Sequence, residues 1–474
     1  MNDATDKDGW VSFHTSQGSE LRGRLVRLSP YAAAFELYHP EAVVQSSESL
    51  GDFRICLRSR TVYSGRAIVR QVVHTGTMLV CETDLDDTGF EPELVAGRSQ
   101  PPRLPERFTE FVRQWQPVCK VSPQFKVAVA DIRTFLDDLR RWLEQVELGL
   151  CVAHGPERAE LERTLIDQLA PQVLPILDGL FEEFERTAAG LDGATVPVHR
   201  SYAQRHLHPV VLCAPFAYRT YRKPLGYPGD YEMVNMMTRD PREGRTLFAK
   251  LFNVWLLQQR SAVAHRNRIE YLTVRLAEET LRALATGRTA QIYSLGCGPA
   301  REVQYFLART ELSNRAQFTL VDFEQEALVH AARVLEEQKT QHHRTTVIGL
   351  QQRSVQKVLK DAAHNPRLTL GQQYDLIYCA GLFDYLPDRT CKRLMEIVYR
   401  SLAPGGLAVA TNVTPFSPNR ASLELILDWH INYRDAAALA ALAPPEAPPE
   451  AVRVWSDATG VNVFLEVRKP HETA

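Results

Sequence analysis

The segment from Gln291 to Glu302 constrains the fold of this chain more than any other. It reads Gln-Ile-Tyr-Ser-Leu-Gly-Cys-Gly-Pro-Ala-Arg-Glu, an apolar run that ends in a glycine turn and continues as the start of a helix. The glycines let the backbone turn sharply and approach a ligand without a Cβ in the way, and the free N–H groups of a helix start attract an anionic group. The segment therefore predicts a buried strand followed by a loop that binds a nucleotide-type ligand.

Later segments indicate a sheet around this loop. Phe318–Asp322 is a second apolar run that ends in a carboxylate, and Tyr374–Asp384 has the form of a strand that ends beside a ligand crevice. Leu402–Thr411 is a glycine turn that leads into another strand, and Val461–Arg468 has the pattern of a final, antiparallel strand. In open α/β sheets, ligands bind outside the carboxyl ends of the strands, where an acid accepts hydrogen bonds from ribose. We therefore expect a Rossmann-like α/β domain with seven strands.

This order of motifs resembles the class I S-adenosylmethionine methyltransferases over about residues 265–469. Arg301 occupies the position that would complete a dinucleotide G-x-G-x-x-G motif, and its bulk disfavours NAD binding. Three further motifs, Tyr221–Met233, Arg266–Arg268 and Leu427–Arg434, resemble more narrowly the bacterial 3-hydroxypalmitate methyl ester biosynthesis methyltransferases.

The resemblance implies S-adenosyl-L-methionine as cofactor, with Asp322 on the ribose hydroxyls and Phe323 beside the adenine. The implied cofactor residues are Tyr227, Gly229, Asp230, Arg268, Gly296, Cys297, Gly298, Pro299, Asp322, Phe323, Ser354, Val355, Ala380 and Gly381.

The chemistry of methyl transfer indicates what else the site needs. An in-line displacement requires aligned reactants in a dry pocket and little acid or base catalysis. A carboxylate acceptor is already ionised near neutral pH, so it needs cationic or hydroxyl groups that orient it. The catalytic candidates for this role are Tyr221, Tyr385, His430 and Arg434, and Arg219 and Lys223 are further cations. For a hydroxyl or amine acceptor, Asp384 or His430 would be the general base. We expect no metal.

The first part of the chain has a different pattern. Residues 10 to about 90 form six short alternating runs with turn residues between them, which predicts a small antiparallel β-barrel. The segment resembles a PilZ domain, which in many relatives binds cyclic di-guanylate. The D/N-x-S-x-x-G element of that family aligns with Arg27–Ala32 and keeps only Ser29, so we interpret the barrel as an interaction module whose partner is a protein or cyclic di-guanylate.

A helical connector follows the barrel. Gln100–Glu106 is a proline-rich linker, and the apolar spacing from Ile132 to Val146 predicts a long helix that packs in a bundle or pairs with a second copy in a homodimer. A second helix is expected over Glu157–Ala189, bent or broken at Pro171 and Pro175.

The predicted domains are residues 1–98 for the barrel, 99–212 for the connector and 213–474 for the methyltransferase domain, whose first part, 213–285, would cover the site. We also expect a lid helix that carries Glu424, Trp429, His430 and Tyr433 on one face, and a flexible connection over 436–451.

The composition of the chain limits the remaining classes of protein. The chain has 474 residues and a formal net charge of −2, so it exceeds one ordinary core and gives no general sign of binding nucleic acid or an anionic membrane surface. No apolar run approaches a bilayer span, the first residues are polar, and the eight cysteines show no C-x-x-C spacing. We expect a cytoplasmic protein.

The family resemblance thus implies an enzyme that O-methylates the carboxylate of a 3-hydroxy fatty acid, or a related small acyl substrate, to a methyl ester signal of the kind used in quorum sensing. Two alternatives stay open: a protein methyltransferase, and a PilZ-type signalling scaffold whose methyltransferase fold only binds the cofactor.

Overall fold

The computed structural model describes residues 9–16, 18–37, 44–57, 60–74, 79–86, 89–90, 120–150, 154–364 and 370–471. These residues form two compact units. The first contains the chain up to Pro228 together with Asp240–Gln259 and Pro418–His430, and the second contains Gly229–Arg239, Arg260–Ser417 and the chain from Ile431. The units differ from the three predicted domains because two later segments fold with the N-terminal part, and the three-domain division stays a prediction.

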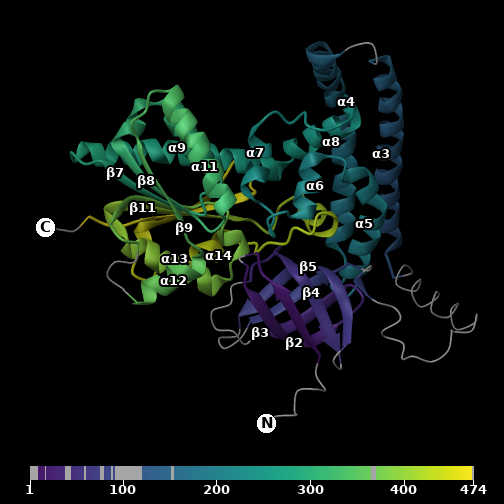
Figure 1. Ribbon diagram of the computed structural model, residues 1–474, viewed down its shortest axis with the longest axis horizontal. Coiled ribbons are helices and arrows are strands. Elements are labelled where there is room, and N and C mark those ends of the chain that lie inside the picture. Colours follow the sequence, from purple (N-terminus) through teal and green to yellow (C-terminus); the bar gives the residue numbers. More distant parts are fainter. Residues whose placement is uncertain are drawn as a thin grey trace, which may run out of the picture. The chain divides into compact units, whose positions relative to one another are not determined.

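The first unit begins with a closed antiparallel barrel of six strands in the order β1-β2-β3-β6-β5-β4, as predicted (Figure 1). The strands are β1 (Trp10–His14), β2 (Glu20–Leu28), β3 (Ala32–Leu37), β4 (Ser49–Leu57), β5 (Arg60–His74) and β6 (Leu79–Leu85). Phe13, Phe35 and Phe53 fill its interior, with ring centroids 5.3 to 5.9 Å apart. Closure of the sheet removes the unpaired strand edges that a small open sheet would expose.

Helices make up the rest of the first unit. They are α3 (Pro123–Gly149), α4 (Gly155–Ala189), α5 (Val196–Val211), α6 (Pro215–Arg222) and α8 (Leu247–Gln258). Apolar residues of α3, α4, α5 and α8 share one hydrophobic core, which confirms the prediction of a bundle within the chain. The α4 helix continues through Pro171 and Pro175, so the expected break is absent there.

The second unit contains a seven-stranded sheet in the order β12-β13-β11-β10-β7-β8-β9. Its strands are β7 (Ala290–Leu295), β8 (Ala316–Asp322), β9 (Val347–Gln352), β10 (Tyr374–Cys379), β11 (Leu402–Val413), β12 (Val452–Ser456) and β13 (Asn462–Arg468). Strands β7 to β11 pair in parallel, whereas β13 is antiparallel to both β11 and β12. The predicted α/β fold and its antiparallel final strand are confirmed.

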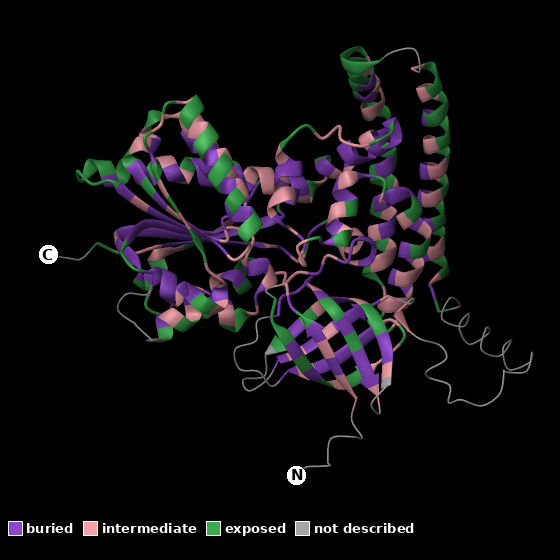
Figure 2. Ribbon diagram, in the orientation of Figure 1, coloured by how far each residue is buried: buried purple, intermediate pink, exposed green. Residues whose placement is uncertain are grey.

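Helices cover both faces of this sheet and bury its central strands, whereas the edge strands β9 and β12 are mostly exposed or half-buried (Figure 2). The helices of the second unit are α7 (Tyr231–Thr238), α9 (Arg260–Ala285), α10 (Arg301–Arg309), α11 (Gln325–Gln341), α12 (Val355–His364), α13 (Asp388–Arg400) and α14 (Ala436–Ala440). Helices α9, α10 and α11 share one hydrophobic core with the sheet, and α12, α13 and α14 share the other. Because successive residues of a strand point to opposite faces, Tyr378 of β10 lies in the first core and Ile377 in the second.

Two local expectations were wrong. The helical part of the expected lid is residues 420–426, which include the π-helical turn η4 (Ser422–Ile426), and Trp429 to Tyr433 have no helical structure. Asp428 interrupts the helix with a left-handed φ of 51°. The stretch 436–451, expected to be a flexible connection, contains α14 and the short 3-10 helix η5 (Pro449–Ala451).

The proline-rich linker, Cys119, Cys151 and Met78 lie outside the described residues. Among the residues that are described, no helix combines the length and apolar character needed to cross a membrane.

Candidate functional site

The glycine turn lies between β7 and α10, as the sequence predicted. Gly296 and Gly298 have φ values of 73° and 50°, and the backbone N–H groups of Gly296 and Cys297 both donate to the carbonyl of Val321 at 2.8 and 3.0 Å. A Cβ placed on Gly298 would meet no atom within 4 Å, so the backbone there faces open space. The turn can therefore accept a ligand against bare backbone.

Asp322, at the end of β8, lies against this turn. Its Oδ2 accepts the N–H of Gly298 at 2.8 Å and its Oδ1 accepts the N–H of Glu324 at 3.0 Å. Burial raises the pKa of Asp322. Each carboxylate oxygen has a second lone pair, so both can also accept a ribose hydroxyl. The N–H of Arg353 donates to the Asp322 carbonyl at 2.8 Å, which brings Ser354 and Val355 to the same edge of the sheet.

Arg268 projects from α9 toward the turn that follows β10. A Cβ on Gly381 would lie 3.1 Å from its guanidinium nitrogens, a tight contact that would displace them slightly. Arg268 is 7% exposed, and its Nη2 lies 2.9 Å from Nδ1 of the His265 ring, which can accept its hydrogen bond. Burial, with the nearby charges of Arg268 and Arg266, holds the pKa of His265 well below its usual range, so this acceptor is neutral.

No carboxylate forms an ion pair with Arg268 within the described part of the chain. Burial lowers the pKa of this guanidinium, and the nearby carboxyl groups of Asp384 and Glu302, which form no ion pair with it, oppose that effect only in part. The side chain is therefore suited to bind an anionic group of a ligand.

Asp384 and Glu302 are the buried carboxyl groups near Arg268, and we call these three residues the strand-end group. Asp384 lies in the short 3-10 helix η3 (Phe383–Tyr385), and its Oδ1 accepts the N–H of Val413 at 2.7 Å. Burial raises the pKa of Asp384 to about 6, against the opposing effect of Arg268. Burial also raises the pKa of Glu302, whose Oε1 accepts the hydroxyl of Tyr378 at 2.7 Å.

The segment before α7 contacts the same region. Gly229 has a φ of 76°, and a Cβ there would lie 2.6 Å from the hydroxyl oxygen of Tyr385. Asp230 caps α7 by accepting the N–H of Met233 at 2.9 Å. This segment is thus held by its backbone conformation against Tyr385, a predicted catalytic residue.

The structure brings together most of the predicted cofactor residues at the carboxyl ends of the parallel strands. Gly296–Pro299 follow β7, Asp322 and Phe323 end β8, Ser354 and Val355 follow β9, and Ala380 and Gly381 follow β10. Cys297 is buried, and burial raises the pKa of its thiol well above the usual range, so it is a neutral packing group. An open glycine backbone, a carboxylate and an unpaired buried arginine together fit a nucleoside attached to an amino-acid carboxylate.

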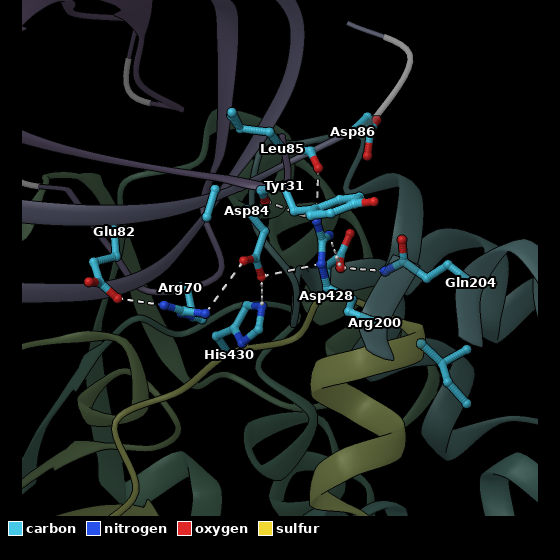
Figure 3. Close-up of polar contacts among 12 residues, drawn as sticks. Tyr31, Arg70, Glu82, Asp84, Leu85, Asp86, Arg200, Gln204, Asp428 and His430 are labelled. Carbon is cyan, nitrogen blue, oxygen red and sulfur yellow. Dashed lines mark hydrogen bonds and ion pairs between the residues drawn. The ribbon is translucent and has the colours of Figure 1, made fainter. Parts of the chain in front are cut away.

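His430 lies elsewhere, in the first unit, within a buried polar cluster shown in Figure 3. Its Nε2 is 3.0 Å from Oδ2 of Asp84 in β6, and Ser47 contacts the backbone N–H and carbonyl of His430. Asp428 accepts from Arg200 of α5 at 2.9 Å and from Arg66 of β5 at 2.8 Å. We call Asp84, Arg66, Arg200, Asp428 and His430 the barrel–helix cluster.

The ligand atoms of Asp84, Asp428 and His430 lie within 4.8 Å of one another, which is close enough for a metal ion. Arg66 and Arg200 already supply positive charge to Asp428, and Gln204 donates to it at 2.6 Å. Burial alone would raise the pKa of Asp428, but the charges of Arg200 and Arg66 outweigh it and hold the pKa well below its usual range. The arrangement therefore fits an ion-pair network better than a metal centre.

Tyr221 also belongs to the first unit. Its ring lies 4.1 Å from the Arg66 guanidinium and packs on His208. Lys223 is buried there too, donates to the carbonyl of Leu427 at 3.2 Å, and has a pKa held well below its usual range by burial. Tyr227 precedes the boundary between the units. The catalytic assignments of Tyr221 and His430 stay predictions, and the contacts of both side chains are those of structural residues.

The sheet order and the strand-end site define the class of the second unit, a Rossmann-like methyltransferase domain. Residues 293–408, about a quarter of the chain, match the family model of a methyltransferase domain. The second unit is therefore that of a methyltransferase, an enzyme whose cofactor is S-adenosylmethionine.

Three solved structures are similar to the chain. A possible exported protein from Bordetella parapertussis shares 18% identity, with 67% of this chain and all of that chain covered and a TM-score of 0.42. Magnesium protoporphyrin IX methyltransferase from Synechocystis PCC 6803 shares 11% identity, with 45% of this chain and 86% of that chain covered and a TM-score of 0.32.

The N-methyltransferase NodS from Bradyrhizobium japonicum shares 15% identity, with 53% of this chain and all of that chain covered and a TM-score of 0.31. These scores are too low to identify an acceptor substrate. No curated protein matches the chain.

Sequence reasoning missed two members of this region, His265 and Glu302. The pair His265 and Arg268 has i, i+3 spacing, so both lie on one side of a helix, and this was the available signal. Glu302 follows the glycine turn directly, but nothing in the sequence shows that its carboxyl group is buried against Tyr378.

Proposed function

We propose that the protein transfers a methyl group from S-adenosylmethionine to the carboxylate of a small acyl acceptor, such as a 3-hydroxy fatty acid, and so forms a methyl ester. The observation that carries the cofactor part of the proposal is Arg268, a buried guanidinium that forms no ion pair with a carboxylate of the described residues. The acceptor part rests on the Tyr385 hydroxyl beside Gly229. When bound, the cofactor supplies a methyl group activated by its sulfonium charge.

In the proposed cofactor site, Arg268 pairs with the carboxylate at the methionine end. Gly296, Cys297, Gly298 and Pro299 give a bare backbone for the adjoining part of the cofactor, and Asp322 accepts the ribose hydroxyls. Phe323, Ser354 and Val355 border the adenine, Ala380 and Gly381 border the sulfonium, and Gly229 and Asp230 approach the amino-acid end. The cofactor role of Tyr227 stays a prediction. Gly298 supports this assignment most directly, because its backbone faces open space.

Tyr385 is the acceptor-orienting group of this proposal. The Gly229 backbone approaches its hydroxyl closely, and both belong to the second unit. An acyl carboxylate needs a hydrogen-bond donor that orients it without taking its charge, and a tyrosine hydroxyl can act in this way. No base is required, because the acceptor is already ionised.

Asp384 decides which acceptor the site can use. Below its pKa of about 6 this carboxyl group is neutral and does not repel an anionic acceptor. Above that pH it is ionised, and it then opposes a second carboxylate but could take a proton from a hydroxyl or an amine. The raised pKa thus also favours a second candidate function, methylation of a hydroxyl or amine acceptor, including a protein side chain.

The pH dependence of kcat/KM separates the two functions. We would measure transfer of labelled methyl from S-adenosylmethionine to free 3-hydroxy fatty acids and to cell-extract proteins between pH 5 and 9, for the wild-type protein and Asp384→Asn. For a carboxylate acceptor, kcat/KM falls as pH rises through about 6, and Asp384→Asn, which cannot ionise, removes the fall.

For a hydroxyl or amine acceptor, kcat/KM rises over the same range and the variant loses activity. Asp322→Ala is the control that should lose transfer to every acceptor. Cofactor binding without any transfer would favour the scaffold alternative instead.

For the barrel, we propose an interaction module of the PilZ type that binds a protein partner. Ser29, the one residue retained from the nucleotide-binding element, is engaged in its own turn, where its Oγ accepts the N–H of Ala32 at 3.0 Å. Arg27 pairs with Glu82 at 3.1 Å. Calorimetry with cyclic di-guanylate tests this, and tight binding of the nucleotide would overturn it.

A further inference from the structure

Arg434 has every hydrogen-bond donor of its side chain in use. Nε donates to Oδ1 of Asp388 at 2.9 Å, and Nη2 donates to the same oxygen and to the carbonyl of Leu386, both at 2.7 Å. Nη1 donates to the carbonyl of Phe383 at 2.7 Å and to Oδ1 of Asn412 at 2.6 Å. A guanidinium has five N–H groups, and these are five contacts.

The hydrogen-bond acceptors of Arg434 show which segment of the chain it fixes. Phe383 and Leu386 lie at the start of η3 and just after it, and Asp388 begins α13, so a single guanidinium spans the whole turn after β10. Carbonyl groups at the end of a helical turn lack partners within the turn and need donors from elsewhere. Arg434 supplies such a donor to the carbonyl of Leu386 and adds a second donor to the carbonyl of Phe383, which already accepts the Leu386 N–H at 3.2 Å. It does so from inside the protein, since it is only 3% exposed.

The chain beside Arg434 holds the same turn. The N–H of Asn432 donates to the carbonyl of Asp384 at 2.6 Å, and the Arg434 N–H donates to the carbonyl of Val413 at 3.0 Å. The N–H of Val413 donates in turn to the Asp384 carboxyl group. Both sides of η3 are thus fixed by residues 432–434 and the end of β11.

We infer that Arg434 is a positioning residue, which fixes the turn carrying Asp384 and Tyr385 and does not contact the acceptor. Binding an acceptor carboxylate would require Arg434 to give up contacts that hold the turn. The role in methyl transfer rests on the proposed function, whereas the role in holding the turn does not.

Arg434 also acts on Asp384 through its charge. The ionisable groups that act on Asp384 are Arg268 of α9, Cys379 of β10, Cys391 of α13 and Arg434. The two arginines lower the pKa of Asp384 and so oppose part of the effect of burial. Loss of the Arg434 charge would therefore raise this pKa further, whereas Arg434→Lys keeps the positive charge and tests the contacts that hold the turn.

The test compares Arg434→Lys and Asp388→Ala with wild type, in the full chain. Asp388 is 72% exposed, so Asp388→Ala removes two of the five contacts and spares the core, should Arg434→Lys fail to fold. Arg400→Ala is the matched control, because it breaks another arginine–carboxylate pair of the same unit, with Glu446 at 2.8 Å.

Hydrogen exchange over residues 381–390 is the first measurement. We expect faster exchange in Asp388→Ala, still faster exchange in Arg434→Lys, and no change in Arg400→Ala. In kinetics, Arg434→Lys should lower kcat by roughly 100-fold with little change in KM, because a small displacement of the reacting groups is that costly. Affinity for S-adenosylhomocysteine should be unchanged.

The inference would be overturned if residues 381–390 exchanged at the wild-type rate in both Arg434→Lys and Asp388→Ala. An increase in KM at unchanged kcat would also overturn it and make Arg434 an acceptor ligand. If the wild-type protein transfers no methyl group, the proposed function fails, and the exchange measurement still decides whether Arg434 holds the turn.

Discussion

The barrel–helix cluster and the strand-end group are both buried sets of charged side chains, but they differ in how their charges are balanced. In the cluster, Asp428 has two arginine partners within 3 Å, and the pKa of its carboxyl group is held low. In the strand-end group, Arg268 forms no ion pair with a carboxylate of the described residues, and burial raises the pKa of Asp384 to about 6. Matched buried charges indicate a structural role, whereas unmatched ones indicate a place for a ligand.

The largest expected effect is on the stability of the cluster. Asp428→Ala leaves Arg66 and Arg200 buried without their partner and should lower the free energy of unfolding by about 3 to 5 kcal/mol. Urea unfolding of the full chain measures this. The control is Arg27→Ala, an exposed residue paired with Glu82, where a loss of no more than about 1 kcal/mol is expected. Equal losses in the two variants would mean that the cluster is not structural.

The next effect has the opposite sign and depends on pH. The pKa of Asp384 is higher in the folded protein than in the unfolded chain, so its ionisation lowers stability as pH rises from about 4 to 6. Asp384→Asn should therefore raise the free energy of unfolding at pH 7.5 by on the order of 3 kcal/mol, and the gain should shrink as pH falls toward 4. A gain that does not change with pH would contradict this assignment.

Removal of the unpaired cation should affect binding and not folding. Arg268→Met is expected to weaken S-adenosylhomocysteine binding by about 1.5 to 3 kcal/mol, the range for a hydrogen bond to a charged group, without lowering the free energy of unfolding. Calorimetric titration and urea unfolding give the two values. Arg309→Ala, which breaks an exposed pair with Glu270, is the control. If Arg268→Met lowered the free energy of unfolding as much as Asp428→Ala, Arg268 would have a partner within the protein. The proposed difference between the strand-end group and the barrel–helix cluster would then be wrong.

The smallest effect concerns the backbone next to Tyr385. Gly229→Ala and Gly287→Ala both place a Cβ on a residue with φ near 75°, which costs about 1 to 2 kcal/mol in each. The Cβ at Gly287 meets nothing within 4 Å, whereas the one at Gly229 would meet Tyr385. Only Gly229→Ala should therefore reduce kcat in a methyl-transfer assay. Equal kcat values in the two variants would show that Gly229 does not position Tyr385.

Regular patterns in the sequence predicted the elements that the structure confirmed. Alternating apolar residues predicted the barrel strands, and the apolar spacing from Ile132 to Val146 predicted α3. The glycine turn after β7 and the acid at the end of β8 were found because strand, turn and helix follow one another along the chain. These features depend on neighbouring residues, which a sequence shows directly.

The predictions that involve His430 and Arg434 depended on contacts between distant residues. Helical spacing placed Trp429, His430 and Tyr433 on one helix face, but Asp428 interrupts that helix with a left-handed backbone conformation. His430 then lies beside Asp84, more than three hundred residues earlier in the chain. No local pattern records such a partner.

The sequence by itself determined the α/β domain, the barrel and the glycine turn, because hydrophobic periodicity and glycine stereochemistry act over a few residues. Only the tertiary structure decided which buried charges are neutralised. Arginines brought from distant segments satisfy Asp428, whereas no carboxylate in the described part of the chain forms an ion pair with Arg268. That difference arises because the free energy of a buried charge depends on the groups that packing places around it.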